Sequence, residues 1–308
     1  MAVDVNVEIV NPQSDAEALA DCAEGVFRAV EKACTRFDPA SPLMQANAAG
    51  QAWYEVPGYC YDALSEAATA HLLTGGRFDP RVLRDLQTLG YDRSLPFGSG
   101  PVDLAGATDS SRGTTLRLRA PWSPGFDPAR SAVRIGPTPV DLGGIGKGLA
   151  VRWAAEQIRG HAEAFLVEAG GDLVTGGPGP TGTGWHAGVE DPRGGETPVA
   201  VIDVTDQGCA TSSIRLRNWR VGGRTVHHIL DPLTGEPGGE GLLSVTVVGP
   251  DPAAAEVWSK TLFLYGAAGI QHAAAVRDLA ALWVDVDGFV ATSPAMAPHL
   301  IWLAPDGR

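Results

Sequence analysis

The sequence predicts an α+β fold, and the order of its segments leads to this class. Strand-like and helix-like segments do not alternate as strand–helix–strand units, as they would in a parallel, doubly wound sheet. No internal repeat is visible. Of the 308 residues, 44% are hydrophobic and 19% are charged, a composition typical of a globular chain rather than a disordered one. The length allows a single domain over residues 1–308, or two packed subdomains within it.

The N-terminal part is predicted to begin with a strand that is followed by helices. Apolar and polar residues alternate over 3–9 and give an opening strand one apolar face. Apolar residues at helical spacing then predict an amphipathic helix over 15–35, with Ser14 and Glu17 as its capping box. Two more helices are predicted, over 59–73 and, shorter, over 80–88.

Most of the remaining chain is predicted to form strands, which glycine- and proline-rich loops separate. The predicted strands are 114–120, 132–136, 164–168, 172–175, 185–190, 199–204, 214–221 and 244–249. A helix is predicted from Asp251 and Pro252, an N-cap followed by proline, to Tyr265. The segment LWVDVDGFVAT is predicted to be a hairpin around Asp287 and Gly288.

The charge of the chain limits its partners. The formal net charge is −13, whereas sequence-independent binding of nucleic acid needs a basic surface. The same acidity disfavours an anionic membrane surface, and the sequence contains no run of about 18 apolar residues that would insert into a membrane. We therefore expect no nucleic-acid partner and no membrane insertion. A polyanionic ligand would need a pocket that is locally positive.

The start of the chain and its cysteines favour the cytoplasm. The first ten residues are predicted to form a strand, and they show neither the basic start nor the apolar core of a signal peptide. No lipoprotein cysteine follows them. The four cysteines form no CxxC pair, so we expect reduced thiols rather than a zinc ribbon or a redox dithiol. The expected location is cytoplasmic, or extracytoplasmic if the natural chain starts further upstream.

The strongest local signal is the segment DLGGIGKG, from Asp141 to Gly148. Its glycines allow the backbone to approach a ligand closely. The helix that follows directs N–H groups and the positive end of its dipole toward that ligand, and Lys147 adds a cation suited to a phosphate. The spacing matches neither GxxxxGK[ST] nor GxGxxG. Spacing alone therefore leaves two interpretations open, a diphosphate site and a glycine-rich turn with an exposed lysine.

Seven motifs occur in order along nearly the whole chain. They are FDPASPLMQAN (37–47), TGGRFDPRV (74–82), VDLGGIGKGLAV (140–151), FLVEAGGDLVTGG (165–177), CATSS (209–213), HHILDPLTGEP (227–237) and SVTVVGPDPAAAEVWSKTLFLYG (244–266). This set resembles the ApbE family, whose corresponding segments include DLGGIAKGYAVD and HIIDPRTGxP. The resemblance implies mixed, largely antiparallel sheets with flanking helices, in one compact unit.

The resemblance also implies an enzyme, a transferase that uses FAD and Mg²⁺. ApbE proteins cleave the diphosphate of FAD, attach FMN through a phosphoester to a Thr or Ser of a target protein, and release AMP. The implied partner is a flavin-accepting protein with a D-G-x-[ST]-G-A-T-like motif. The implied FAD-binding residues are Met1, Phe37, Arg77, Phe78, Asp79, Asp141, Lys147 and Ile229. Lys147 is also implied to act in catalysis, by stabilising charge on the diphosphate.

His228 is the candidate general base. The transfer removes a proton from a hydroxyl nucleophile, and an imidazole titrates near neutral pH. From the residues alone, the favoured role is structural: a histidine beside His227 that binds the carbonyl groups of the following turn. The resemblance to HIIDP favours catalysis.

The implied metal site departs from the family pattern. The family places Asp and Thr four residues apart on the closing helix, facing Mg²⁺, where this chain has Glu256 and Lys260. The carbonyl of Gly144 is a further implied ligand. A protonated lysine has no lone pair for a metal. Three interpretations stay open: an ordinary helix ion pair, an ammonium group that takes part of the metal's place, or Mg²⁺ bound by Glu256, Gly144 and water. The second predicts that chelation inhibits this protein less than the family pattern implies.

Three functions stay open on the sequence. The first is FAD:protein FMN transfer. The second is a metal-dependent FAD pyrophosphatase that releases FMN and AMP, with water in place of the hydroxyl nucleophile. The third is a non-catalytic FAD-binding protein, and the departure at Glu256 and Lys260 is the reason to keep it.

Overall fold

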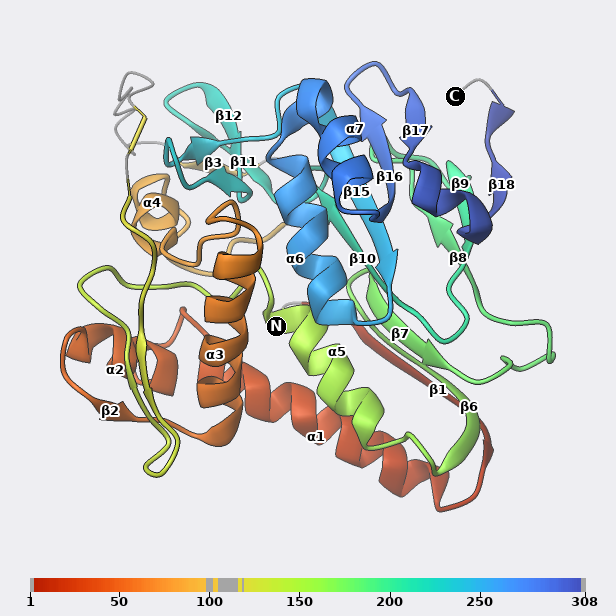
Figure 1. Cartoon of the computed structure of the whole chain (residues 1–308), viewed down its shortest axis with the longest axis horizontal. Coiled ribbons are helices and arrows are strands. Elements are labelled where there is room, and N and C mark those ends of the chain that lie inside the picture. Colours follow the sequence, from red (N-terminus) through yellow and green to blue (C-terminus); the bar gives the residue numbers. More distant parts are fainter. Residues whose placement is uncertain (1–2, 98–101, 105–115, 118, 306–308) are drawn as a thin grey trace. The chain divides into compact units, whose positions relative to one another are not determined.

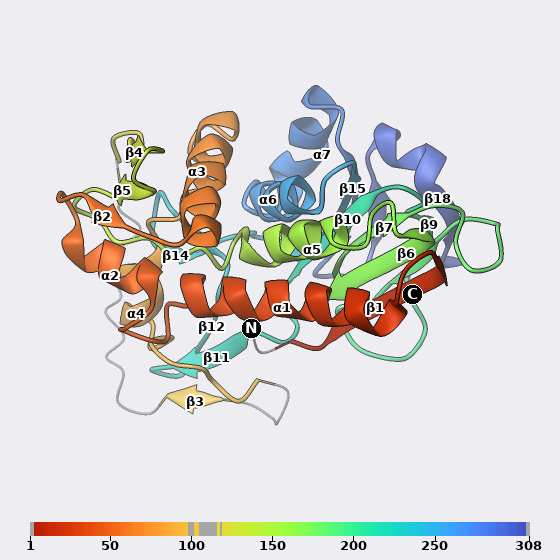
Figure 2. The ribbon, with the colours of Figure 1, turned by 90° about the horizontal axis from the view of Figure 1, so that it is seen from below.

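The computed structural model describes residues 3–97, 102–104, 116–117 and 119–305 (Figures 1 and 2). The chain divides into two compact units. The first consists of residues 1–31, 145–212 and 240–308, and the second of residues 32–144 and 213–239. Both combine helices with sheets, and most of their strand pairs are antiparallel. The predicted α+β class is confirmed.

The first unit is built on a seven-stranded sheet in the order β1-β6-β7-β10-β15-β16-β17 (Figure 1). Its strands are β1 (Val5–Pro12), β6 (Ala162–Ala169), β7 (Asp172–Gly176), β10 (Gly208–Ser213), β15 (Leu242–Gly249), β16 (Ala280–Asp285) and β17 (Val290–Thr292). Strands β6 and β7 form an antiparallel hairpin. Gly170 and Gly171 make its turn with φ of 58° and 89°, a conformation that a side chain disfavours.

Helices cover this sheet in the first unit. They are α1 (Ala16–Cys34), α5 (Gly146–Glu156), α6 (Pro252–Phe263), α7 (Gly266–Val276) and the 3₁₀ helix Pro294–His299. Helices α5 and α6 pack against each other and against the sheet (Figure 1). A Cβ on Gly148 would lie 2.6 Å from the carbonyl oxygen of Pro252 and from Cα of Ala253. Only a glycine therefore lets the start of α5 approach the start of α6 so closely.

A three-stranded sheet in the order β18-β9-β8 completes the first unit. Its strands are β8 (His186–Val189), β9 (Ala200–Asp203) and β18 (Leu300–Leu303). Ile202 of β9, Leu282 of β16 and Met296 are fully buried in one apolar cluster. Burial of such side chains contributes about 1.5–3 kcal/mol each, so this cluster joins the two sheets.

The second unit contains shorter elements. Its helices are α2 (Pro42–Ala49), α3 (Gly58–Leu73) and α4 (Leu83–Thr88), and its strands are β2 (Tyr54–Glu55), β3 (Asp103–Leu104), β4 (Gly125–Asp127), β5 (Ala132–Arg134), β11 (Asn218–Val221), β12 (Arg224–His227), β13 (Leu230–Asp231) and β14 (Glu236–Pro237). Trp219 is buried in an apolar cluster with Leu86, Tyr91 and Val226. Its indole N–H donates to the carbonyl of Leu89 at 2.7 Å, which satisfies the polar end of a buried aromatic side chain.

Most predicted elements are confirmed, with ends that shift by a few residues. They include the opening strand, the helices over 15–35, 59–73 and 80–88, the hairpin near the C-terminus and the helix after Asp251. The side chain of Asp251 accepts from the amide of Ala254 at 2.8 Å, so it is the predicted N-cap. Among the described residues, no helix is both long and apolar enough to cross a membrane.

Three local predictions are wrong. The side chain of Asp15, not of Ser14, caps α1, because its carboxylate accepts from the amides of Glu17 and Ala18 and Ser14 bonds to His161 instead. Of the strand predicted over 114–120, residues 116, 117, 119 and 120 are irregular, and the others lie outside the described residues. The strand predicted over 214–221 is limited to Asn218–Val221.

Candidate active site

Four charged side chains of the first unit form one cluster, which we call the lysine–carboxylate cluster: Lys147, Asp172, Glu256 and Lys260. The ammonium group of Lys147 donates to Oδ2 of Asp172 and lies 3.3 Å from Oε1 of Glu256. Lys260 Nζ lies 2.9 Å from the same Oε1. Two positive and two negative groups thus compensate one another, as buried charges require.

The elements of the first unit fix each member of this cluster. Lys147 is in the first turn of α5, Asp172 opens β7, and Glu256 and Lys260 are one turn apart on α6. The other oxygen of Glu256, Oε2, accepts the amide of Gly148 at 2.8 Å. The N–H groups at the start of α5 were predicted to face a ligand, but the amide of Gly148 binds the carboxylate of Glu256. The close packing of α5 on α6 at Gly148 therefore sets the place of the cluster.

Further hydrogen bonds fix the surroundings of the cluster. The amide of Thr211 donates to Oδ1 of Asp172 at 3.3 Å. Ser212 and Ser259 share a buried hydroxyl–hydroxyl hydrogen bond of 2.8 Å, which ties β10 to α6. Asp172, Glu256 and Ser259 expose none of their surface. A site held by such contacts keeps its geometry when a substrate binds.

Burial and charge act against each other on the pKa values of the cluster. Burial opposes the ionisation of Glu256, but the ammonium groups of Lys147 and Lys260 outweigh it and lower the pKa of Glu256 to about 2. Burial raises the pKa of Asp172 in spite of the neighbouring Lys147, and it lowers the pKa of Lys260 in spite of Glu256. Glu256 is therefore ionised at neutral pH and anchors both ammonium groups.

A divalent metal ion does not fit this donor set. Mg²⁺ binds oxygen ligands at about 2.0–2.1 Å, so an ion on Oε1 of Glu256 would lie against two ammonium groups already in contact with that oxygen. Its charge would also leave the buried cluster strongly positive, which is costly. No group of three or more His, Cys, Asp or Glu side chains in the described part of the chain is arranged to hold a metal.

Arg36 and Asp141 form a buried ion pair in the second unit. Arg36 Nε lies 2.8 Å from Oδ2 of Asp141, and the side chains are 7% and 8% exposed. The guanidinium carbon lies 4.2 Å from the ring centroids of both Phe37 and Tyr91, at the distance of a cation–π contact. Phe37 itself is 41% exposed. The guanidinium group of Arg36 thus covers one face of the Phe37 ring, and the exposed part of the ring is accessible to an aromatic ligand.

The segment from Arg77 to Asp79 is occupied by contacts within the second unit. Arg77 forms an ion pair with Asp231 at 3.2 Å. Phe78 is buried, and its carbonyl accepts from the His71 ring at 3.0 Å. Asp79 pairs with Arg81 at 2.7 Å, and although burial opposes its ionisation, these contacts lower the pKa of Asp79. The described contacts of Phe78 and Asp79 are therefore structural.

His228 is half-buried in the second unit, between His227 and the buried Ile229. Its Nδ1 lies 3.3 Å from the carbonyl oxygen of Arg217. A carbonyl can only accept, so Nδ1 carries the hydrogen and Nε2 is the basic nitrogen of the neutral ring. Burial lowers the pKa of the neighbouring His227 to about 4, so His227 is neutral at pH 7.

The structure brings together Lys147, Glu256 and Lys260 among the predicted site residues. The other predicted residues with described positions, from Phe37 to Gly144 and at 228–229, belong to the second unit, and Met1 lies outside the described residues. No role was predicted for Asp172 or Arg36. For Asp172 a signal was present, because a carboxylate that opens an apolar strand needs a buried partner.

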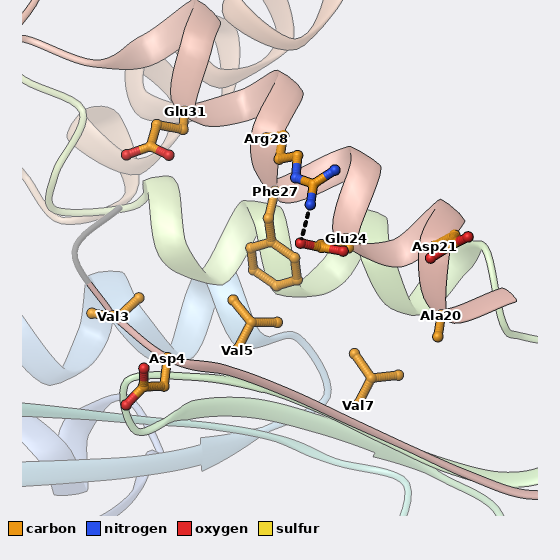
Figure 3. Close-up of a pocket in the computed structure, with 10 residues that line it drawn as sticks. All are labelled: Val3, Asp4, Val5, Val7, Ala20, Asp21, Glu24, Phe27, Arg28 and Glu31. Atoms are coloured by element: carbon orange, nitrogen blue, oxygen red, sulfur yellow. Dashed lines mark hydrogen bonds and ion pairs between the residues drawn. The ribbon is translucent and has the colours of Figure 1, made fainter. Parts of the chain in front are cut away.

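A groove of about 450 Å³ lies elsewhere in the first unit, between α1 and β1 (Figure 3). Val5, Val7 and Phe27 contribute apolar side chains to it. Its charged lining residues are Asp4, Asp21, Glu24, Arg28 and Glu31. Because this lining is predominantly acidic and Arg28 is paired with Glu24, the groove repels a diphosphate. It is not a candidate for the phosphates of FAD.

Comparison with known sequences gives one family. Residues 1–283 match the profile of the ApbE family. The FAD:protein FMN transferase of Klebsiella pneumoniae (strain 342) is 30% identical over 151 residues, which are 48% of this chain and 43% of that protein. The one of Treponema pallidum (strain Nichols) is 29% identical over 73% of this chain and 65% of that protein. Over the aligned part, the chain thus spans less than half of the length of the first relative.

Comparison with solved structures gives the same architecture. The crystal structure of the ApbE protein of Thermotoga maritima MSB8 aligns with a TM-score of 0.79 at 26% identity, over 96% of this chain and 95% of that one. The flavin transferase ApbE of Vibrio cholerae aligns with a TM-score of 0.76 over 97% and 96% of the two chains, and at 22% identity it supports the fold alone. Because the profile match and this architecture extend over most of its length, the chain belongs to the ApbE family.

Proposed function

We propose that the chain is an FAD:protein FMN transferase. It would cleave the diphosphate of FAD, attach the FMN half to a Thr or Ser hydroxyl of a target protein, and release AMP. The relatives from Klebsiella pneumoniae and Treponema pallidum carry this name. We further propose that the target protein carries the accepting Thr or Ser in a D-G-x-[ST]-G-A-T-like motif.

The lysine–carboxylate cluster is the observation that carries the proposal. It holds two ammonium groups, of Lys147 and Lys260, whose side chains are 14% and 16% exposed. Their buried carboxylate partners fix them, so they need no reorganisation when a substrate binds. Preorganised cations of this kind stabilise the charge that develops on a diphosphate as it is cleaved. Although Asp172 and Glu256 offset their charge, the two ammonium groups provide N–H donors for the diphosphate oxygens of FAD.

The proposed step is a substitution at the FMN-side phosphorus of FAD. The hydroxyl oxygen of the target forms a bond to this phosphorus, and the bond from phosphorus to the bridging oxygen breaks. The electron pair of that bond leaves with AMP, whose new phosphate oxygen takes the developing negative charge. Lys147 and Lys260 would stabilise that charge through N–H donors.

His228 is the proposed general base of this step. Nε2 would accept the proton of the attacking hydroxyl, since Nδ1–H donates to the carbonyl of Arg217. Phe37 and Asp141 are proposed to bind the flavin half, Phe37 through the accessible face of its ring. Arg77, Ile229 and Met1 remain proposed FAD-binding residues by the resemblance of their motifs.

One assay tests the proposal against its alternatives. The protein is incubated with FAD and a target domain that carries the motif, and the products are followed by nucleotide chromatography and in-gel flavin fluorescence. AMP together with a fluorescent target is the expected result. AMP with free FMN and no labelled target would instead establish a pyrophosphatase. Bound FAD with neither product would establish a non-catalytic flavin-binding protein.

Two variants test the assigned roles. His228→Gln should lower the rate of transfer by about 10²–10⁴-fold, the usual contribution of a general base, without weakening FAD binding. Lys147→Met should weaken FAD binding and transfer together, because it removes a cation from the diphosphate. A His228→Gln protein with the full transfer rate would remove His228 from the role of base.

A further inference from the structure

The chain contains few lysines, and most of them belong to the lysine–carboxylate cluster. The sequence has three lysines, Lys32, Lys147 and Lys260, whereas the other 20 of its 23 basic residues are arginines. Lys32 is exposed on α1. The remaining two meet in the cluster. An ammonium group is a compact point charge, unlike the broad, planar guanidinium group, so a site that needs two adjacent point charges requires lysine.

The charge of the cluster equals that of a metal site. Two ammonium groups carry the charge of one divalent cation, and Asp172 and Glu256 offset that charge as two carboxylate ligands would. Each ammonium group has three N–H donors and can bind phosphate oxygens, as a metal ion does through vacant coordination positions. The cluster therefore presents to a diphosphate the charge of a magnesium site without the metal.

Burial separates this cluster from an ordinary helix ion pair. Glu24 and Arg28 on α1 have the same spacing of four residues, and their side chains are 50% and 74% exposed. The side chains of Glu256 and Lys260 are only 1% and 16% exposed, and Glu256 also contacts Lys147. A surface pair has little effect on a ligand because water screens it. A buried pair of cations acts on a phosphate with much less screening.

We propose that Lys147 and Lys260 together replace the divalent cation, so that this chain cleaves FAD without a protein-bound metal ion. The inference rests on the proposed function for its substrate, FAD, but its central claim concerns metal binding and is measured without turnover. Lys260 is the residue that makes the difference, because its ammonium group occupies the charge position that a metal ion would otherwise fill beside Glu256.

The test has two measurements on the full chain. Isothermal titration calorimetry with Mg²⁺ or Mn²⁺ alone should show no saturable binding to the wild-type protein at millimolar metal. AMP release from FAD in excess chelator should stay within about twofold of the rate with Mg²⁺, since no transition-state contact is lost. Saturable binding of either metal, or loss of AMP release in chelator with recovery on adding Mg²⁺, would overturn the inference.

Lys260→Thr is the informative variant. It removes one ammonium group, leaves Lys147 against two carboxylates and adds a hydroxyl ligand. The variant should therefore gain saturable Mn²⁺ binding, and its rate of AMP release in excess chelator should fall by at least about tenfold. A thermal melt checks that it folds. Lys32→Thr, at an exposed position, is the control and should leave the wild-type responses unchanged. If Lys260→Thr gains no metal binding although it is folded, Lys260 is not what excludes the metal, and the inference is wrong.

The two proposals fail in different ways. A wild-type protein that binds no metal and releases no AMP under any condition would contradict the transferase and the cleavage of FAD, and it would support only the replacement of the metal ion by the two ammonium groups. A wild-type protein that transfers FMN only with Mg²⁺ would support the transferase and contradict the metal-free cluster.

Discussion

Lys260 Nζ lies 2.9 Å from Oε1 of Glu256, one turn earlier on the same helix. In sequence, Glu and Lys four residues apart are an ordinary stabilising pair of a solvent-exposed helix, with an effect of about 0.2–0.5 kcal/mol. In the structure both side chains are largely buried, and a second ammonium group, that of Lys147, contacts the same oxygen. Glu256 therefore holds both ammonium groups in position, and loss of this contact should lower both the stability of the protein and its affinity for FAD.

Replacement of the buried carboxylate tests this electrostatic role. Glu256→Gln leaves two ammonium groups against one carboxylate in a buried site, and we expect the free energy of unfolding to fall by about 3–5 kcal/mol. Urea denaturation measures the change. Glu24→Gln, in the exposed pair of the same spacing, should change stability by less than about 0.5 kcal/mol. Equal, small effects of the two substitutions would show that the cluster is as solvated as the surface pair.

The glycines of the DLGGIGKG segment differ in what surrounds them. Gly148→Ala would place a Cβ 2.6 Å from the backbone of Pro252 and Ala253, and we expect overpacking to cost about 1–3 kcal/mol. Gly146→Ala is the matched control, because no atom apart from the adjacent residues and the nearby backbone of the same helix lies within 4 Å of the position that the added methyl group would take. It should be neutral or stabilising by up to about 1 kcal/mol. Thermal melts of the two variants test this difference, and equal melting temperatures would contradict the close contact of α5 and α6.

His227 should make the protein less stable on acidification. Its pKa in the folded chain is lowered from 6.5 to about 4, chiefly by burial. The unfolded chain thus binds a proton between pH 6.5 and 4 that the folded chain does not, so stability is present above pH 6.5 and falls toward pH 4, by about 3 kcal/mol from this group. Urea denaturation at several pH values measures the slope. His227→Asn should flatten it over this window, and an unchanged slope would assign the acid sensitivity to other groups.

Arg36 predicts a link between stability and flavin binding. Arg36→Met removes the partner of the buried Asp141 and the cation beneath the ring of Phe37. We expect a loss of about 3–5 kcal/mol of stability and a weaker affinity for FAD where the protein is still folded. Denaturation and FAD fluorescence titration give the two readouts. Arg93→Met is the control, because Arg93 pairs with Asp92 at the surface and should leave both unchanged.

The elements were predictable where local patterns decide them. Alternation of apolar residues gave β1, and Asp251 with Pro252 marked the start of α6. Helix α7 was not separated from α6, because its alanine- and glycine-rich sequence shows little periodicity. Gly266, with φ of 66°, marks the break between the two helices. Beside this break, the amide of Ala267 donates to the carbonyl of Glu240 at 2.9 Å, a contact with a distant residue that no local pattern reveals.

The candidate site was predictable only in part. Lys147, Glu256 and Lys260 were identified by the resemblance of their motifs, and the structure brings these three together. The fourth member of the cluster, Asp172, meets Lys147 because β7 passes beside the start of α5, a contact between residues 25 positions apart. The amide of Gly148 could not be assigned to Glu256 either, because 108 residues separate them. Tertiary packing sets both contacts.

The central claim is that this chain binds FAD through the preorganised ammonium groups of Lys147 and Lys260. A direct FAD titration tests this claim. The quenching of flavin fluorescence, or calorimetry, is measured once in excess chelator and once with Mg²⁺. We predict saturable binding with similar affinity in both conditions, and weaker binding for Lys147→Met. The absence of measurable FAD binding in both conditions would contradict the claim.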